Sequence, residues 1–214
     1  MKLASALYDS FYPFDKFEGL FTDFYCAVKP VDLQPDSVLV VWGGADISPS
    51  LYNKPVSTYT NADEKLSHRD YGEWSLMNRA KDMGLPIIGV CRGAQMLCAL
   101  AGGHLIQDTT GHTSSHDMET NDGRVIKTSS LHHQMLYPFD VEHVMLATAK
   151  KLLSNHYIDV NEFGADVEVS MPCEPEAVWF PKVKGLAVQG HPEFMHHQTA
   201  YNKWMHEKIK ELVC

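Results

Sequence analysis

The sequence of 214 residues lacks an excess of positive charge. It has 18 lysines and arginines against 27 aspartates and glutamates, a net charge of -9, and no cluster of basic residues. Because phosphate contacts dominate the binding of nucleic acids, this charge balance argues against a nucleic acid as partner. It also argues against binding to an anionic membrane surface.

Long apolar runs are missing too. No segment approaches the roughly 18 consecutive apolar residues that predict a membrane-spanning helix. The N-terminal segment MKLASALYDSF contains Asp9, whereas a secretory signal peptide needs an uninterrupted apolar region of about 7–15 residues. We therefore expect no membrane partner and a cytoplasmic location.

Patterns that would build disulfides or metal centres are also absent. The five cysteines are an odd number without framework spacing, so we expect reduced thiols. The chain has neither an HExxH nor a CxxC array, and its paired histidines are adjacent rather than one helical turn apart. We predict no metal and no other cofactor, and we expect most histidines at the surface or in a pocket: His104, His112, His116, His132, His133, His196 and His197.

Short runs of apolar and β-branched residues are present, and they predict strands. Segments 37–44 and 86–90 are apolar on both faces, which is typical of buried parallel strands. Further strands are expected at 124–130, 144–149, 167–171, 177–180 and 185–190. Helical spacing of apolar residues predicts helices at 69–84, 92–103 and 196–213.

The order of these elements predicts the class of fold. Strand–helix–strand order in the first half indicates a mostly parallel α/β sheet flanked by helices, and the strand-rich second half indicates an antiparallel extension. Segment 47–68 contains many helix and strand breakers, so it should form a long loop. No repeat or linker divides the chain, and we expect a single domain over residues 1–214.

The segment Gly89-Val90-Cys91-Arg92-Gly93 joins a predicted strand to a predicted helix. The pattern G-x-C-x-G is typical of a nucleophile elbow, in which glycines relieve crowding where a strand turns sharply into a helix. The positive end of that helix would favour the thiolate of Cys91. The Arg92 N–H would point to where an oxyanion forms. A buried structural thiol is the alternative, because free cysteine is among the most buried residue types.

Segment 187–194, with the sequence AVQGHPEF, offers a base for such a nucleophile. Its strand delivers His191, and Pro192 biases that histidine to an extended conformation. Residues two apart in an extended segment project to the same side, so the Glu193 carboxylate can orient the imidazole. Because a cysteine nucleophile needs a base, this pairing favours catalysis by Cys91.

Gly43 and Gly44 follow a predicted buried strand and offer a second donor for an oxyanion. Without side chains, their backbone can approach a ligand closely. An ordinary turn at the end of a strand is the alternative interpretation, and both can hold. With a base and two donors assigned to Cys91, the interpretation as a buried thiol passes to Cys98 in the same helix.

Four separated segments resemble one known family. WGGADISPSLY, GVCRGAQML, SSLHHQ and QGHPEF occur in the order and spacing of the class I glutamine amidotransferase superfamily. GGADISPSLY and RDYGE make the chain more similar to its peptidase C26 branch, the γ-glutamyl hydrolases, which include γ-glutamyl-γ-aminobutyrate hydrolase. The resemblance extends from Val38 to the terminal helix, and it implies a flavodoxin-like α/β fold.

The resemblance also implies roles for single residues. Cys91 would be the nucleophile, His191 the general base and acid, and Glu193 the residue that orients the imidazole. The oxyanion hole would use the backbone N–H groups of Gly44 and Arg92.

Further positions match substrate-binding parts of the family. Gln95 would hold the amino-acid end of a γ-glutamyl group. The substrate-binding set would comprise Gly43, Gln95, His132, His133 and Gln134. A segment near the substrate entrance of the hydrolase branch is matched by Arg69, Asp70 and Glu73.

Three segments depart from the family pattern. The residues before Val38 lack the usual first-strand pattern, so we expect an unusual first β–α unit. Ser129 stands where the branch commonly has asparagine. Segment 111–123 is polar, and we expect it to form a distinct lip on the pocket. These differences concern the choice of substrate more than the reaction.

Together these features predict a hydrolase that cleaves a γ-glutamyl amide through a γ-glutamyl thioester on Cys91. The substrate would be glutamine, with ammonia passed to a separate synthetase, or a γ-glutamyl amide of a larger amine. A binding or regulatory module on an inactive amidotransferase scaffold is the alternative, against which the intact Cys91, His191 and Glu193 argue. A metal-dependent hydrolase is a third hypothesis, which insensitivity to chelators would remove.

Overall fold

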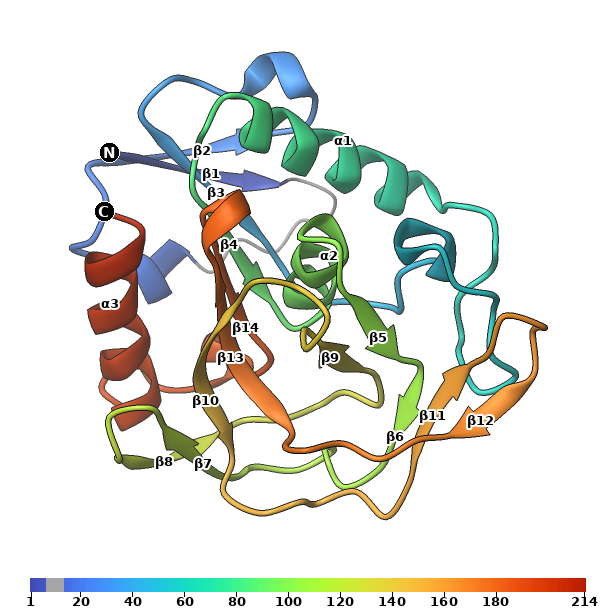
Figure 1. The fold of residues 1–214 in the computed structure, drawn as a ribbon. Coiled ribbons are helices and arrows are strands. Elements are labelled where there is room, and N and C mark those ends of the chain that lie inside the picture. The colour runs from blue at the N-terminus through green and yellow to red at the C-terminus, as the bar shows by residue number, and fades with distance from the viewer. Residues whose placement is uncertain (7–13) are drawn as a thin grey trace.

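The computed structural model of the protein describes residues 1–6 and 14–214. Its centre is a nine-stranded sheet in the order β2-β1-β3-β4-β14-β13-β10-β7-β8 (Figure 1). Five neighbouring strands are parallel: β2 (Asp23–Ala27), β1 (Lys2–Ala6), β3 (Ser37–Val41), β4 (Ile87–Val90) and β14 (Gly185–Val188). Four antiparallel strands extend the sheet: β13 (Pro175–Phe180), β10 (Val144–Ala149), β7 (His116–Thr120) and β8 (Val125–Thr128). The predicted α/β fold with its antiparallel extension is confirmed.

The central strands are buried on both faces because successive side chains point in opposite directions. Leu39 and Val41 on β3 belong to one apolar cluster, together with Ile87 on β4. Val38 and Val40, in alternation with them, belong to a second cluster on the other face. This double burial explains why segments 37–44 and 86–90 are apolar throughout.

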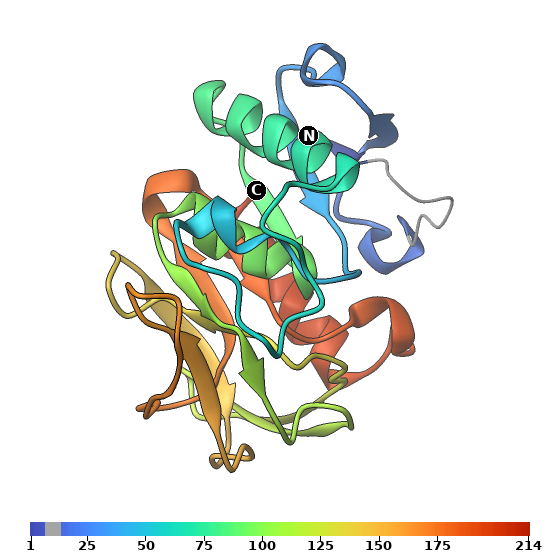
Figure 2. The same cartoon turned by 90° about the vertical axis from the view of Figure 1, so that its right-hand side faces the viewer.

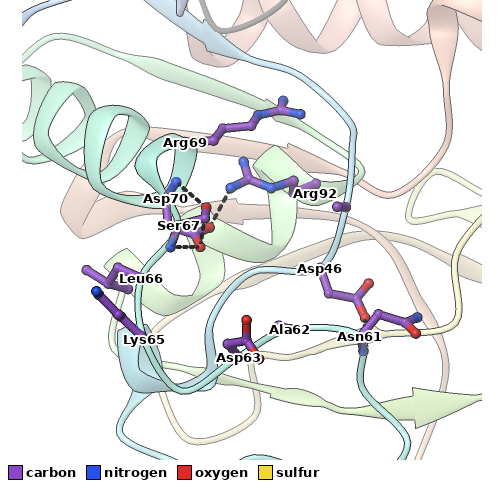
Figure 3. Close-up of a pocket in the computed structure, with 11 residues that line it drawn as sticks. Asp46, Asn61, Ala62, Asp63, Lys65, Leu66, Ser67, Arg69, Asp70 and Arg92 are labelled. Carbon is purple, nitrogen blue, oxygen red and sulfur yellow. Dashed lines mark hydrogen bonds and ion pairs between the residues drawn. The ribbon is translucent and has the colours of Figure 1, made fainter.

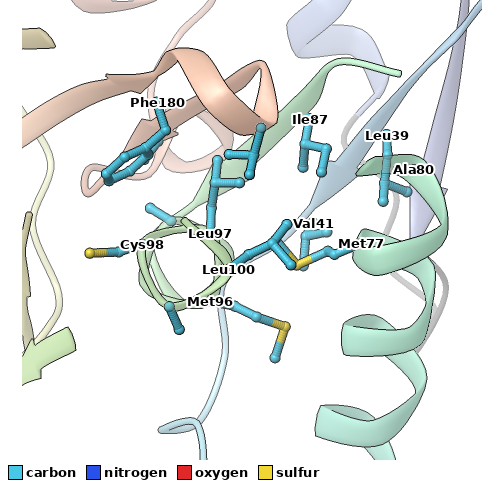
Figure 4. Close-up of a cluster of buried hydrophobic side chains, with 14 of the residues drawn as sticks. Leu39, Val41, Met77, Ala80, Ile87, Met96, Leu97, Cys98, Leu100 and Phe180 are labelled. Atoms are coloured by element: carbon cyan, nitrogen blue, oxygen red, sulfur yellow. The ribbon is translucent and has the colours of Figure 1, made fainter. Parts of the chain in front are cut away.

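The three α-helices of the described residues divide between these two faces. Helices α1 (His68–Asp82) and α2 (Arg92–Leu100) supply the first cluster, which Figure 4 shows gathered around α2. Helix α3 (Ala200–Leu212) supplies Tyr201, Trp204, Met205 and Ile209 to the second. In Figure 1, α3 lies on the left, whereas α1 crosses the top of the molecule and α2 lies at its centre. None of the helices in the described residues is long and apolar enough to cross a membrane.

Two small sheets flank the main one, and most of their strands are too short to be predicted from sequence. Strands β5 (His104–Ile106) and β9 (Met135–Tyr137) pair with each other. Strands β6 (Asp108–Thr109), β11 (Tyr157–Val160) and β12 (Asp166–Glu168) form the second small sheet (Figure 2). The predicted loop over 47–68 is irregular apart from the short 3-10 helix η3 (Pro49–Tyr52).

The segment before Val38 contains two strands of the main sheet that the sequence did not predict. Strand β1 is present and pairs with β3, although its pattern was not recognised in the sequence. Residues 14–36 contain the edge strand β2 and two short 3-10 helices, η1 (Phe14–Phe17) and η2 (Pro30–Asp32), but no α-helix. Residues 7–13 lie outside the described part of the chain, and the unusual first unit stays a prediction.

Segment 111–123 was expected to form a polar lip, and this prediction is wrong in part. Residues His116–Thr120 form strand β7, which pairs with β10 and β8 inside the main sheet. Met118 on this strand is fully buried in the second apolar cluster. The polar residues alternate with buried ones, and a strand with one solvated face needs no continuous apolar run.

Candidate active site

Cys91 lies between the end of β4 and the start of α2, at the turn that the sequence predicted. Its backbone has φ 49° and ψ -106°, a conformation that non-glycine residues rarely adopt. Such strain costs about 1–3 kcal/mol and occurs mainly at functional sites. Hydrogen bonds fix the turn on both sides, because the Cys91 N–H donates to the Val188 carbonyl at 2.8 Å and the Cys91 carbonyl accepts from the Gln95 N–H at 3.0 Å.

The two glycines that flank Cys91 are required by close backbone approaches. A Cβ atom at Gly89 would lie 2.4 Å from the Gly93 carbonyl oxygen. A Cβ atom at Gly93 would lie 2.1 Å from the carbonyl oxygen of Val41, on the neighbouring strand. The G-x-C-x-G pattern is therefore explained by the tight packing of α2 against β3 and β4.

His191 follows β14, and its ring is held by Glu193. The Nδ1 atom lies 2.7 Å from a Glu193 carboxylate oxygen, and both side chains are buried. Burial alone would lower the pKa of His191, but interactions with Cys91 and Glu193 raise it to about 10. Apart from its interaction with Cys91, the buried Nε2 atom makes no hydrogen bond.

The predicted reason for the His191–Glu193 contact was an extended segment, and this reason is wrong. Pro192–Phe194 forms a short 3-10 helix, η5, and His191 is extended only as its N-cap. The turn still directs the Glu193 carboxylate back to the imidazole. Phe194 stacks on the His191 ring with centroids 4.7 Å apart, so it covers one face of the imidazole.

Gly43 shows that Cys91 and His191 meet at one point. A Cβ atom at Gly43 would lie 2.8 Å from Cε1 of His191 and 3.5 Å from Cβ of Cys91. The three residues follow β3, β4 and β14, which are adjacent parallel strands. Ligands of open α/β sheets bind at the carboxyl ends of such strands.

The candidate oxyanion donors lie on two sides of this point. The Arg92 N–H belongs to the first turn of α2, where backbone N–H groups have no acceptor within the helix. Gly44 lies against Arg69, since a Cβ atom there would be 2.1 Å from a guanidinium nitrogen. Arg69 in turn donates to the Gly43 carbonyl at 2.8 Å, which orients the backbone of the loop.

Arg69, Asp70 and Glu73 match a substrate-entrance segment, but two of them are buried against the side chain of Arg92. Asp70 accepts from the Arg92 guanidinium at 2.6 Å, Glu73 forms an ion pair with it, and Glu73 also binds Arg69 at 3.0 Å. Asp70 and Glu73 are 3% and 2% exposed, and their pairs with Arg92 brace the turn. The sequence analysis missed the Arg92 side chain, although its position inside an otherwise apolar helix is a usable signal.

A cavity of about 360 Å³ opens beside this network (Figure 3). Residues from the loops after β3 and before α1 line it, together with the starts of α1 and α2: Ala45, Asp46, Asn61, Ala62, Asp63, Lys65, Leu66, Ser67, Arg69, Asp70 and Arg92. In Figure 3 the Arg92 side chain reaches toward Asp70 at the cavity wall. The cavity therefore carries charges of both signs next to the elbow.

In the HHQ segment, His133 contacts a residue of the cavity wall, whereas His132 and Gln134 are buried. His133 lies 3.0 Å from Asp46 and 3.1 Å from Asp108, and its interactions with these two carboxylates raise its pKa to about 9 against the effect of burial. His132 is 7% exposed and donates from Nδ1 to the Gln134 carbonyl at 2.9 Å. Of the predicted substrate-binding residues, Gly43 and His133 thus contact cavity-lining side chains, namely Arg69 and Asp46.

Gln95 and Gln134 are buried, and both have partners within the protein. The Gln95 amide donates to the Gln134 carbonyl at 3.1 Å, and the Gln134 amide donates to the Thr60 hydroxyl at 2.9 Å. Gln95 therefore joins the first turn of α2 to the HHQ segment. Ser129 was noted in the sequence only as a departure. Its hydroxyl accepts from the His191 N–H at 2.9 Å and donates to the His191 carbonyl at 2.8 Å.

The cysteines and histidines outside the proposed triad differ in their burial. None of the five cysteines forms a disulfide. Cys98 is fully buried, as predicted, and burial raises its pKa to about 12. His196 and His197 are exposed as expected, but the expectation is wrong for His112, which is fully buried. Among the described residues, His112, His132 and Glu176 are placed so that they could hold a metal ion.

Comparisons with other sequences identify relatives of the chain. The family model described as Peptidase C26 matches residues 33–193. A Mycobacterium tuberculosis protein named as a candidate glutamine amidotransferase is 35% identical over 115 residues, which cover 47% of this chain and 37% of that protein. Protein NtpR of Enterococcus hirae is 26% identical over 168 residues, which cover 76% of this chain and 69% of NtpR. The chain thus spans little more than a third of the mycobacterial relative.

Solved structures share the fold. A Thermoplasma acidophilum protein described as a candidate component of GMP synthase matches with a TM-score of 0.67 and 14% identity, over 100% of this chain and 94% of that one. A glutamine amidotransferase of Thermotoga maritima matches with a TM-score of 0.57 and 14% identity, over 99% and 83%. With the family model matching most of its length, the chain belongs to the peptidase C26 branch of the class I glutamine amidotransferase superfamily.

Proposed function

We propose that the protein hydrolyses a γ-glutamyl amide, with Cys91 as nucleophile and His191 and Glu193 completing a catalytic triad. The observation that carries this proposal is the convergence of a strained elbow cysteine with a buried imidazole that a carboxylate holds at 2.7 Å. Interactions with Cys91 and Glu193 raise the pKa of His191 to about 10, which favours the protonated ring beside the nucleophile.

The proposed reaction has two halves. Cys91 Sγ attacks the γ-carbonyl carbon, and the N–H groups of Gly44 and Arg92 stabilise the oxyanion that forms. The carbon–nitrogen bond breaks as the His191 imidazolium gives its proton to the departing amine, which leaves a γ-glutamyl thioester. His191, now neutral, takes a proton from water, and the hydroxide breaks the carbon–sulfur bond to release glutamate and the thiolate.

Two kinds of leaving group fit this chemistry. Ammonia leaves when the substrate is glutamine, and a separate synthetase would then use it. The likeness in fold to a protein described as a component of GMP synthase supports this version. A larger amine leaves when the substrate is another γ-glutamyl amide, and the cavity of about 360 Å³ beside the elbow has room for it. His133 and Asp46 face each other at the edge of that cavity.

The second candidate is a binding or regulatory module that has lost catalysis. The elbow strain at Cys91 speaks against it, because a conformation that costs stability has no purpose in a module that does not use the thiol. Glutamate release distinguishes the two hypotheses directly.

The test is a panel of glutamine and γ-glutamyl amines, with released glutamate as the readout. We expect Cys91→Ala to lower kcat/KM by more than about 1000-fold and His191→Asn to be nearly as severe. Cys214→Ser is the matched control, since this cysteine is exposed and distant in sequence from the elbow, and it should keep full activity. Near-normal glutamate release by Cys91→Ala would overturn the mechanism, and absence of release from every substrate by the unaltered protein would favour the binding module.

A further inference from the structure

A second group of side chains that can bind a metal or a proton lies in the interior, and it includes His132 of the HHQ segment. His112 comes from the loop between β6 and β7, His132 from the loop between β8 and β9, and Glu176 from β13. They are 0%, 7% and 1% exposed. Imidazole and carboxylate groups are rarely buried so deeply unless they are paired or bind a metal.

Several polar atoms of this group have no hydrogen-bond partner. Nε2 of His132 and Oε2 of Glu176 have none, and the two ring nitrogens of His112 face carboxylate oxygens at 3.2 and 3.4 Å without hydrogen-bond geometry. Leaving a buried polar atom unpaired costs about 1–3 kcal/mol. One ligand atom from each of the three side chains lies within 4.8 Å of the others. The three side chains thus bring possible ligand atoms close together.

The second nitrogen of His132 and the second carboxylate oxygen of Glu176 each interact with a neighbouring residue. The Nδ1 atom of His132 donates to the Gln134 carbonyl at 2.9 Å. Oε1 of Glu176 lies 2.7 Å from His116 Nε2. Metal-binding histidines usually give their second nitrogen to a carbonyl or carboxylate in this way, and metal-binding carboxylates are likewise hydrogen-bonded.

His112 follows the same pattern through Glu174. Its Nε2 atom lies 3.2 Å from a Glu174 oxygen, and its Nδ1 atom lies 3.4 Å from Glu176. Glu174 itself is saturated, since it accepts from the N–H groups of Leu153 and Ser154 and from the Tyr157 hydroxyl. Glu174 is therefore a supporting residue, and Nδ1 of His112 is the nitrogen left to bind a metal.

We propose that Nδ1 of His112, Nε2 of His132 and a Glu176 carboxylate oxygen bind one divalent transition-metal ion, with Zn²⁺ as the best fit. Two imidazoles and one carboxylate are a ligand set that Zn²⁺ accepts, with a water molecule as fourth ligand. Bond lengths of about 2.0–2.2 Å require the three ligand atoms to move together and the stacked rings of His112 and His132, with centroids 4.6 Å apart, to rotate. No catalytic step of the proposed hydrolysis passes through this ion.

The ion would tie the HHQ segment to the main sheet. Ser129, three residues before His132, holds the backbone of His191 from both sides. Glu176 lies on β13, which pairs with β14, the strand that leads to His191. A metal between His132 and Glu176 would therefore brace the loop that positions the catalytic histidine, which is a positioning role.

A proton is the competing occupant. An imidazolium at His112 between Glu174 and Glu176 would also satisfy part of the cluster, and interactions with these carboxylates raise the pKa of His112 to about 9 despite its burial. A proton leaves Nε2 of His132 without a partner, however, whereas a metal ion uses all three unpaired ligand atoms.

The first experiment measures metal content in protein purified without a polyhistidine tag, then loaded with Zn²⁺ and dialysed. We expect about one equivalent of Zn²⁺ per chain in the unaltered protein and less than about a tenth in His132→Gln and His112→Gln. The double variant His196→Gln, His197→Gln removes an exposed histidine pair and should retain the full equivalent. Zinc binding that survives His132→Gln but is lost from the surface variant would overturn the proposal.

The second experiment needs no variant, so it holds even where a substitution prevents folding. Co²⁺ is loaded in place of Zn²⁺, and the proton NMR spectrum is examined for paramagnetically shifted imidazole N–H signals. Two such signals are expected, one from each histidine ligand, because each keeps a proton on its other nitrogen. Failure of the unaltered protein to bind either ion, or Co²⁺ binding without shifted imidazole signals, would assign the cluster to a proton instead.

Discussion

The imidazole of His191 has an acidic group on each side, the thiol of Cys91 and the carboxylate of Glu193. In the proposed mechanism these neighbours have different tasks. The thiol changes its charge as the catalytic cycle forms and breaks its bond to the substrate. The Glu193 carboxylate keeps its charge and fixes the ring by a hydrogen bond of 2.7 Å. Glu193 should therefore set the pH range over which His191 can act as an acid.

We predict that Glu193→Gln moves the alkaline limb of the pH profile of kcat/KM to lower pH. In the unaltered protein the pKa of His191 is raised from 6.5 to about 10, so the imidazolium predominates at neutral pH and is lost as the pH rises through 10. Removing one of the charges that raise this pKa makes the loss begin earlier. We also expect kcat/KM at neutral pH to fall by about 10- to 100-fold.

The measurement is glutamate release from pH 6 to 11, with Glu162→Gln as control because Glu162 is exposed and has no part in the proposed site. An unchanged alkaline limb in Glu193→Gln would mean that Glu193 does not act on His191.

Residue types were the most predictable part of the site. Two patterns can be recognised in the local sequence alone. One is the cysteine flanked by glycines, and the other is the histidine followed two residues later by glutamate. The contacts of Ser129 with His191 could not be predicted, since they join residues that are 62 positions apart. The same holds for the buried His112, whose carboxylate partners Glu174 and Glu176 lie on a distant strand segment.

At the scale of elements, α1 and α2 are joined by charged side chains in an otherwise apolar interface. Arg92 on α2 is 1% exposed and pairs with Asp70 and Glu73 on α1. Removing one partner from a buried ion pair leaves an uncompensated charge, which costs far more than loss of a surface pair.

We predict that Glu73→Ala lowers the free energy of unfolding by about 3 kcal/mol. Glu207→Ala is the matched control, because Glu207 binds Arg124 at 2.7 Å but both side chains are well exposed, and it should cost less than about 1 kcal/mol. Urea unfolding followed by circular dichroism measures both values. Equal costs for the two substitutions would contradict the view that the Arg92 network braces the elbow.

The packing of α2 against β3 gives a second prediction for the elements. Gly93→Ala places a Cβ atom 2.1 Å from a backbone oxygen of Val41, which cannot move without shifting the strand. We expect a loss of more than about 2 kcal/mol in the free energy of unfolding. Gly72→Ala on α1 meets nothing within 4 Å and should stabilise the protein by about 0.5–1 kcal/mol.

The same urea titration compares the two alanine variants. Destabilisation by both would show a general intolerance of alanine and would remove the argument that Gly93 is required by close packing.

Elements buried on two faces could be predicted, and those with mixed surroundings could not. Strands β3 and β4 are short runs buried throughout, which are easily recognised as strands. The apolar residues of α1 and α2 recur at helical spacing. Strand β7 has the sequence HDMET, in which two buried side chains alternate with charged ones, so its membership of the sheet depends on its neighbours β8 and β10. Strands of two or three residues such as β6 have no pattern to recognise.

For the molecule as a whole, the order of the strands explains where the site lies. Residues 43, 91 and 191 are far apart in the sequence, but β3, β4 and β14 are neighbours in the sheet and end at the same edge. The strand order brings β14 next to β4 across about a hundred intervening residues, a pairing that no local pattern predicts. The family resemblance implied the class of fold, which the structure confirms.

The central claim is that Cys91, and no other thiol, attacks a γ-glutamyl carbonyl. The most direct test is incubation with a glutamine-analogue diazoketone, followed by mass spectrometry of the intact protein and of its peptides. We predict a single adduct on the peptide that carries Cys91, with glutamine slowing its formation and Cys91→Ala abolishing it. An adduct on Cys98 instead, or glutamate release that continues in protein fully labelled on Cys91, would contradict the account.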